Sequence, residues 1–151
     1  MKKTLLIISV LFFSIYSKAQ VEISTSPIAI LFEVGVFGID YNLNDDFSVG
    51  VDFAFGQGGG AFYVNGKHYF SPRVGNDRFF LGTFGGTFGS FDDSDNGSGL
   101  GFLFGYKWVS KRNITFEWSG GLGRDFTGEI GFLPYYKLNI GYRFNQKTPK
   151  K

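Results

Sequence analysis

The 151-residue sequence contains no cysteine. Without thiols the chain cannot form disulfides, bind a metal through thiolates, use a cysteine nucleophile or carry the lipidated cysteine of a lipoprotein. It also has only four prolines and one histidine, His68. Glycine and phenylalanine are abundant instead, with 23 and 20 copies, and this composition is unusual for a soluble globular domain.

Long apolar runs are scarce too, and the one at the N-terminus is typical of a secretory signal. Lys2 and Lys3 precede an apolar run over residues 5–15, and Ser17-Lys18-Ala19 forms a small-residue cleavage site. The run is shorter than the roughly 20 helical residues that span a bilayer. We therefore expect residues 1–19 to be a cleaved signal peptide and the mature protein to be exported.

The expected mature chain carries little net charge. Cleavage removes three lysines and no acidic residue, so the formal net charge falls from +2 to −1. No strong positive field remains that would attract nucleic acid. The basic tail over residues 145–151 is short, and we expect it to be solvated on the periplasmic side.

Alternation with a period of two recurs after the leader and predicts β-strands with two different faces. In residues 47–56, for example, large apolar side chains alternate with Ser48, Gly50, Asp52 and Ala54. The pattern predicts eight strands, at residues 23–33, 36–42, 47–56, 61–70, 79–91, 100–109, 113–125 and 134–144.

Two of these segments depart from simple alternation. Pro27 lies inside the first expected strand, although proline cannot donate a hydrogen bond to a β-ladder. In residues 79–91 the aromatic side chains change parity, which indicates a β-bulge near Gly82.

An even number of strands of this length favours an all-β, antiparallel, up-and-down, eight-stranded transmembrane β-barrel over residues 20–144. Alternation alone would also fit a soluble lipocalin-like barrel, whose apolar face points inward around a ligand. The composition of the polar face distinguishes the membrane barrel from the soluble one. This face consists mainly of small residues rather than the Lys, Glu and Gln that a water-exposed wall would carry. We therefore expect the apolar face to point at lipid.

Aromatic residues near the strand ends are expected to form the two girdles of a membrane barrel. His68 and Arg124 share the lipid-facing parity but lie near a rim, where a charge is tolerated. The inner-rim girdle would comprise Phe47, Phe70, Phe80, Trp108, Phe116, Tyr142 and Phe144, and the outer-rim girdle Phe55, Phe62, Phe88, Phe102 and Tyr136.

The last strand, YYKLNIGYRF, looks like the aromatic-ended signal that the barrel assembly machinery reads. With the leader and the strand count, it makes the chain resemble the small eight-stranded outer-membrane barrels of the OmpA and OmpX type. Two departures are Asn139, where the signal usually has glycine, and the continuation past Phe144 as NQKTPKK. The resemblance implies a monomer in contact with outer-membrane lipid and lipopolysaccharide, but no particular activity.

Seven charged residues have inward-facing parity. A charge away from bulk water must be paired or solvated, so we expect a structural charge network in the lumen, with Lys107 and Glu117 as one pair across a turn. The alternative is that the network gates a narrow ion-conducting pore. The seven residues are Asp40, Asp52, Lys67, Lys107, Glu117, Lys137 and Arg143.

Catalytic and metal-binding readings have little support. His68 would need a nucleophile nearby, yet the next residue on its face is Phe70. The acidic run at residues 91–97 resembles the start of a calcium loop, but Leu103 stands where a closing Glu is needed. We therefore expect no cofactor, no metal and no enzymatic activity, but an envelope-integrity or surface-contact role. The alternatives are the narrow pore and a soluble periplasmic barrel that binds an apolar ligand.

Overall fold

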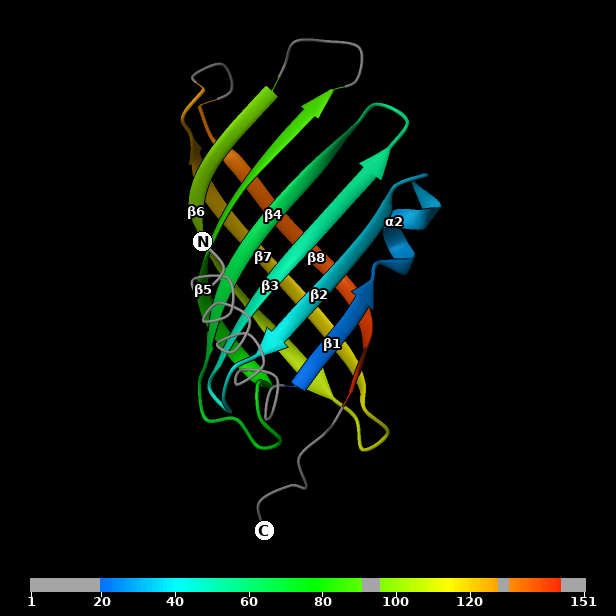
Figure 1. Cartoon of the computed structure of the whole chain (residues 1–151), viewed down its shortest axis with the longest axis vertical. Coiled ribbons are helices and arrows are strands. Elements are labelled where there is room, and N and C mark those ends of the chain that lie inside the picture. The colour runs from blue at the N-terminus through cyan, green and yellow to red at the C-terminus, as the bar shows by residue number, and fades with distance from the viewer. Residues whose placement is uncertain (1–19, 91–95, 128–130, 145–151) are drawn as a thin grey trace, which may run out of the picture.

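The computed structural model describes residues 20–90, 96–127 and 131–144, which form a closed antiparallel β-barrel (Figure 1). The strands follow one another around the barrel in chain order, and β1 pairs with β8 to close it. This confirms the all-β, up-and-down, eight-stranded architecture. The elements are β1 (Gln20–Thr25), α2 (Pro27–Leu31), β2 (Gly35–Asn42), β3 (Phe47–Gly56), β4 (Gly59–Tyr69), β5 (Arg78–Ser90), β6 (Asn96–Val109), β7 (Ile114–Asp125) and β8 (Leu133–Arg143).

Two expected segments, the signal peptide at residues 1–19 and the tail at 145–151, lie outside the described residues. Within the described ranges, no helix has the length and apolar character needed to cross a membrane.

The first expected strand, residues 23–33, is wrong in its extent. The strand ends at Thr25, and a short helix begins directly after it. Ser26 caps this helix, because its Oγ accepts a 3.3 Å hydrogen bond from the backbone N–H of Ala29. Pro27 suits the first helical turn, where its missing N–H would have no intrahelical partner. The residue that cannot donate to a ladder therefore ends the strand early. The other seven expected strands are confirmed, with small shifts at their ends.

The expected bulge near Gly82 is also wrong. Strand β5 pairs with β4 and with β6 in unbroken register. Phe80 and Phe84 point into the lumen and are buried, whereas Phe79 and Leu81 on the opposite parity are exposed. Both faces of β5 are apolar, and this explains the change in aromatic parity.

For the same reason, Phe80 and Phe88 are not girdle residues. Phe80 is fully buried, and Phe88 packs against the buried cluster inside the barrel. Glycines on neighbouring strands leave room for these rings: Gly105 lies opposite Phe80 in the β5–β6 register, and a Cβ there would collide with the Phe80 ring. The other expected girdle residues are exposed.

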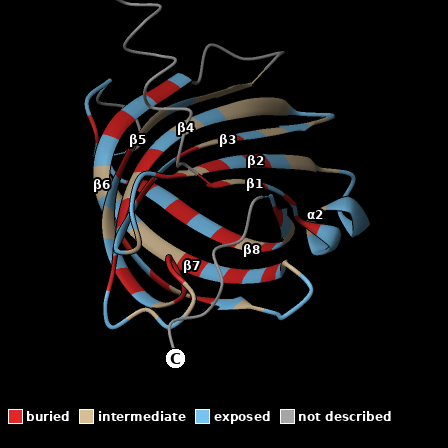
Figure 2. Ribbon diagram, turned by 60° about the horizontal axis from the view of Figure 1, so that its bottom comes forward, coloured by how far each residue is buried: buried red, intermediate tan, exposed pale blue. Residues whose placement is uncertain are grey.

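The outer surface is apolar on every strand. Figure 2 shows exposed and buried residues alternating along the strands, as a two-faced wall requires. The exposed parity of each strand carries a large apolar side chain. From β1 to β8, one example per strand is Ile23, Ile39, Phe53, Val64, Leu81, Phe104, Trp118 and Ile140.

The two ends of the barrel differ. The β2–β3, β4–β5 and β6–β7 turns lie at the same end as the start of β1, at the bottom of Figure 1, which we call the lower end. The β4–β5 turn folds back over the barrel: Gly75, Asn76 and Asp77 are buried. The backbone N–H of Asn76 donates a 2.7 Å hydrogen bond to the Asp45 carbonyl of the neighbouring turn. The lower end is therefore covered by its own turns.

Candidate functional site

The candidate site is a cluster of buried charges in the lower half of the lumen. Every strand except β5 contributes at least one of them, from the parity that faces the lumen. Four are acidic and four are basic, and none is more than 7% exposed. The eight are Glu22, Asp40, Asp52, Glu117, Lys67, Lys107, Lys137 and Arg143.

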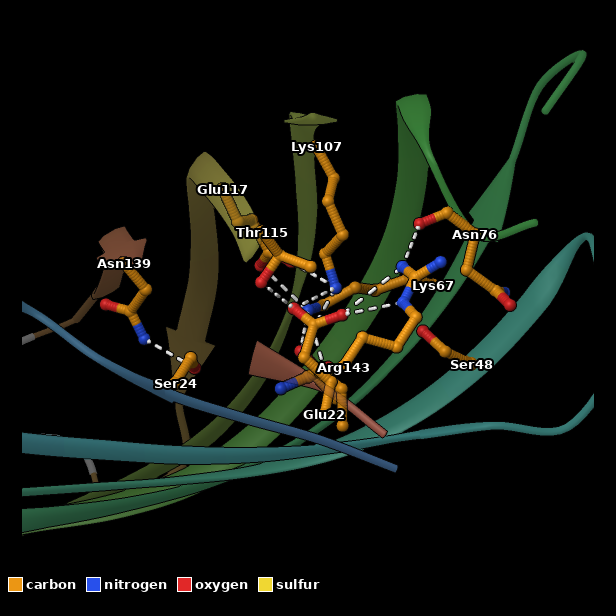
Figure 3. A network of polar contacts seen from close by, with 12 residues as sticks. Glu22, Ser24, Ser48, Lys67, Asn76, Lys107, Thr115, Glu117, Asn139 and Arg143 are labelled. Atoms are coloured by element: carbon orange, nitrogen blue, oxygen red, sulfur yellow. Dashed lines mark hydrogen bonds and ion pairs between the residues drawn. The ribbon is translucent and has the colours of Figure 1, made fainter. Parts of the chain in front are cut away.

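Two lysines connect the carboxylates at the centre of this cluster (Figure 3). Lys67 Nζ lies 2.9 Å from Asp40 Oδ1 and 2.8 Å from Glu117 Oε1. Lys107 Nζ lies 2.8 Å from Glu117 Oε2 and 3.3 Å from Asp40 Oδ2. The same nitrogen is 3.2 Å from Glu22 Oε1. Each lysine therefore joins acidic residues from at least two strands.

Lys107 also offsets the repulsion between two carboxylates that the strand register places opposite each other. Glu22 and Asp40 lie directly opposite each other on β1 and β2. Like charges in that position are destabilising. Lys107 contacts both carboxylates, so the two negative charges share a counter-ion. Its nitrogen also lies 5.7 Å from the centre of the Tyr69 ring.

Asp52 and Lys137 form the upper part of the network. Lys137 Nζ lies 2.7 Å from Asp52 Oδ1. Tyr135 and Asn65 donate hydrogen bonds of 2.9 and 2.7 Å to Asp52 Oδ2. Both oxygens of this buried carboxylate are therefore occupied, as its desolvation requires.

Arg143 forms the lower part and joins the wall to the turn that covers it. Its guanidinium lies 3.2 Å from Glu22 Oε2. It also donates hydrogen bonds to the backbone carbonyls of Gly75 and Asn76, at 2.5 and 2.9 Å. Thr115 donates a 2.8 Å hydrogen bond to the other oxygen of Glu22. The planar guanidinium carries several N–H donors, so Arg143 can bind the Glu22 carboxylate and the two backbone carbonyls at the same time.

Aromatic rings occupy part of the lumen above the charges. The Tyr135 ring stacks on Phe84 at a centroid distance of 4.8 Å, and its edge-to-face contact with Tyr63 is 5.5 Å. Leu103 and Leu133 are buried in the same cluster. The small-residue lumen expected from the sequence is thus correct for the glycines of β6 and β7, but large rings from β4, β5 and β8 occupy the space that those glycines leave.

Three carboxylates of the network come close enough to bind a metal ion together. One oxygen from each of Glu22, Asp40 and Glu117 lies within 4.8 Å of the others. However, Lys107 contacts all three, and Lys67 contacts two of them. The lysines already supply the positive charge that such a site would take from a cation, so the arrangement fits an ion-pair network better than a metal centre.

All seven charged residues expected in the lumen point inward in the structure, and Lys107 and Glu117 face each other in the β6–β7 register. The sequence reasoning missed Glu22. The expected first strand starts at Ile23, so Glu22 falls outside it, and the expected lumen then holds four basic residues and three acidic ones. That imbalance was a usable signal, since buried charges in a narrow lumen are expected to be balanced.

His68 lies on the outer face of β4, near the lower end, as expected. It is exposed, and its ring packs edge-to-face on Phe70 at 4.9 Å. Ser71, the nearest serine in sequence, belongs to the β4–β5 turn.

Comparisons with protein-family models, curated proteins and solved structures found no match to the chain. The interpretation of the site therefore depends on its own geometry.

Proposed function

We propose that the chain is a non-enzymatic integral protein of the bacterial outer membrane, exported through a cleaved signal peptide. The observation that carries the proposal is the inverted distribution of side chains: large apolar residues are exposed on the outside of all eight strands, while the charged residues are buried inside. Lipid is the solvent in which such a surface is stable, whereas a water-soluble barrel places its apolar face inward.

The rare charges on the outer face agree with this proposal. Among the strand residues that the structure describes, the acidic or basic side chains with outward parity are His68 and Arg124. Both lie near strand ends, where a membrane barrel would meet the interface. A basic residue costs about 0–1 kcal/mol there, against about 2–4 kcal/mol at the bilayer midplane.

The contents of the lumen favour a closed barrel over a pore. The charges form direct ion pairs, the β4–β5 turn covers the lower end, and aromatic rings occupy the upper half. We therefore propose that the network has a structural role: it fills the barrel and holds strands together that are not neighbours. Such a sealed monomer, in contact with lipid and lipopolysaccharide and inserted by the barrel assembly machinery, would serve envelope integrity or surface contact.

Cell fractionation combined with gel migration tests the location. We expect the native chain to fractionate with outer membranes and to migrate faster in detergent gels before boiling than after it. Release into the soluble fraction on osmotic shock would contradict the proposal and favour the soluble periplasmic alternative.

Planar-bilayer recordings separate the sealed barrel from the narrow pore. Neither the wild type nor Glu117→Gln is expected to show discrete conductance, because aromatic rings and the covering turn remain in both. Conductance steps in the wild type, or steps that appear in the variant, would favour a pore that the charge network gates.

A further inference from the structure

The barrel wall has a gap at its seam. Strand β1 pairs with β8 only from Glu22 opposite Arg143 to Thr25 opposite Ile140. Strand β8 continues upward to Leu133, so residues 133–139 have no strand partner on the β1 side among the described residues. On the other side of the gap, β2 extends above its last pair with β1 by Gly35 and Val36.

Helix α2 lies at this gap, contacts both β2 and β8, and lines the outer part of the opening with Ile28 and Ala29. Figure 1 shows the helix projecting from the side of the barrel beside β2. It has no buried residue, and Ile30 and Leu31 are 59% and 80% exposed. The helix therefore adds further apolar surface around the opening.

A cavity of about 490 Å³ passes through the wall at this point. Inside the barrel it is lined by Ala54, Ala61, Tyr63 and Tyr135, and its outer part is lined by Leu138 and Tyr136. The volume falls within the range of about 300–1,000 Å³ that small-molecule sites have. Because the cavity includes residues of both parities on β8, it connects the upper lumen with the outer apolar surface.

Two alanines create the inner part of this space. Ala54 and Ala61 are directly opposite each other on β3 and β4, and both have inward parity. Below them the cavity ends at Asp52 and Lys137, which are ion-paired with each other at 2.7 Å. The floor therefore offers no free charge to a ligand, and the walls are mainly apolar.

We propose that this cavity binds one hydrocarbon chain of a membrane lipid, which enters sideways through the gap between β2 and β8. The inference rests on the proposed membrane location, because only then does the opening face lipid. The chain would fill an apolar space that is continuous with the lipid-facing wall, while its headgroup stays outside.

Photolabelling in vesicles tests this proposal. The probe is a phosphatidylethanolamine with a diazirine at the end of one acyl chain, and labelled sites are mapped by mass spectrometry of the full-length protein. We expect labels on lipid-facing residues such as Val64 and also on Tyr63, which faces the lumen. Tyr69 is the internal control, since it has the same side chain, strand and parity but lies 1% exposed in the sealed lower half.

The outcomes separate the two proposals. Labels on Val64 without any on Tyr63 or Tyr135 would overturn the lipid-chain site and leave the membrane location intact. An absence of labels on Val64 and on the other outward residues would contradict the membrane location itself. Equal labelling of Tyr63 and Tyr69 would also overturn the site, because it would indicate a generally open lumen.

A cavity-filling variant adds a second test. Ala61→Leu is expected to abolish labelling of Tyr63 and Tyr135 while labels on Val64 persist. Gly120→Leu is the matched control, because Gly120 lies on the outer face of β7 and a Cβ there meets no atom within 4 Å. If Ala61→Leu loses its heat-modifiable migration, Ala54→Leu blocks the same space from the opposite strand. Persistent lumen labelling in a folded filled variant would overturn the proposal.

Discussion

The ammonium nitrogen of Lys67 lies 2.8 Å from Glu117 Oε1, although their strands, β4 and β7, are not neighbours in the barrel. The same nitrogen contacts Asp40 on β2 at 2.9 Å. Hydrogen bonds between adjacent strands hold the wall, but these ion pairs hold opposite sides of the wall together. Because both partners are buried, the loss of one leaves an uncompensated charge away from water.

Glu117→Gln is expected to lower the free energy of unfolding by about 3–5 kcal/mol, because it leaves Lys67 and Lys107 with one buried partner fewer. Urea unfolding in lipid vesicles, followed by tryptophan fluorescence, measures the change. Glu33→Gln is the control, since Glu33 is exposed in the connection between α2 and β2. It should change stability by less than about 0.5 kcal/mol. Equal effects of the two substitutions would contradict a structural role for the network.

Replacing both members of a pair should cost less than the two single replacements together. Lys107→Met and Glu117→Leu each leave a lumen with unequal numbers of acidic and basic groups, whereas the double variant restores the balance. We expect a favourable coupling energy of about 0.5–3 kcal/mol from the double-mutant cycle. The same unfolding measurement supplies it. Additive effects would mean that Lys107 and Glu117 are stabilised independently of each other.

Arg143→Lys is expected to loosen the β4–β5 turn. A lysine keeps the charge but cannot reach Glu22 and the carbonyls of Gly75 and Asn76 together, because it lacks the planar fork. Trypsin cleavage after the exposed Arg73 should become faster in the variant. Arg112→Lys, in the exposed β6–β7 turn, should leave that cleavage rate unchanged. An unchanged rate in Arg143→Lys would show that other contacts hold the turn.

Adjacent glycines on β7 should respond in opposite ways to alanine. Gly121 has inward parity, and a Cβ there would collide with the backbone oxygen of Phe102. Gly121→Ala should therefore destabilise the barrel by about 1–3 kcal/mol through overpacking. Gly120→Ala meets open space and should be neutral or stabilising by about 0.4–1 kcal/mol, because it restricts the unfolded chain. Urea midpoints that move equally would contradict the close approach of β6 and β7.

Arginine substitutions at two depths of β4 test whether lipid covers the outer face. Val64 is in the middle of the strand, and His68 is near its lower end. Val64→Arg should cost about 2–4 kcal/mol and His68→Arg about 0–1 kcal/mol if the strand spans a bilayer. The two variants are compared by unfolding in vesicles. Similar small costs at both positions would mean that water covers the middle of the strand.

Most of the strands could be predicted because the alternation of apolar and polar residues indicates directly which side chains face outward and which face inward. Where both faces are apolar, as in β5, the same signal fails, since Phe79 and Phe80 then look alike in the sequence. The first strand failed for a different reason. The apolar residues after Pro27 continue the composition of a strand, and only the capping of α2 by Ser26 shows that the backbone turns away there.

The sequence by itself determined the number of strands after the first, the parity of each of them except β5, and seven of the eight charged residues of the lumen cluster. Those features depend on neighbours along the chain and follow from the two-residue period of a strand. The tertiary structure alone decided that Glu22 completes the charge balance, that Lys67 reaches Glu117 fifty residues away, and that the seam between β2 and β8 is open. These contacts join residues that only closure of the barrel brings together. The pattern of neighbouring residues along the sequence does not show which side chains meet across the lumen.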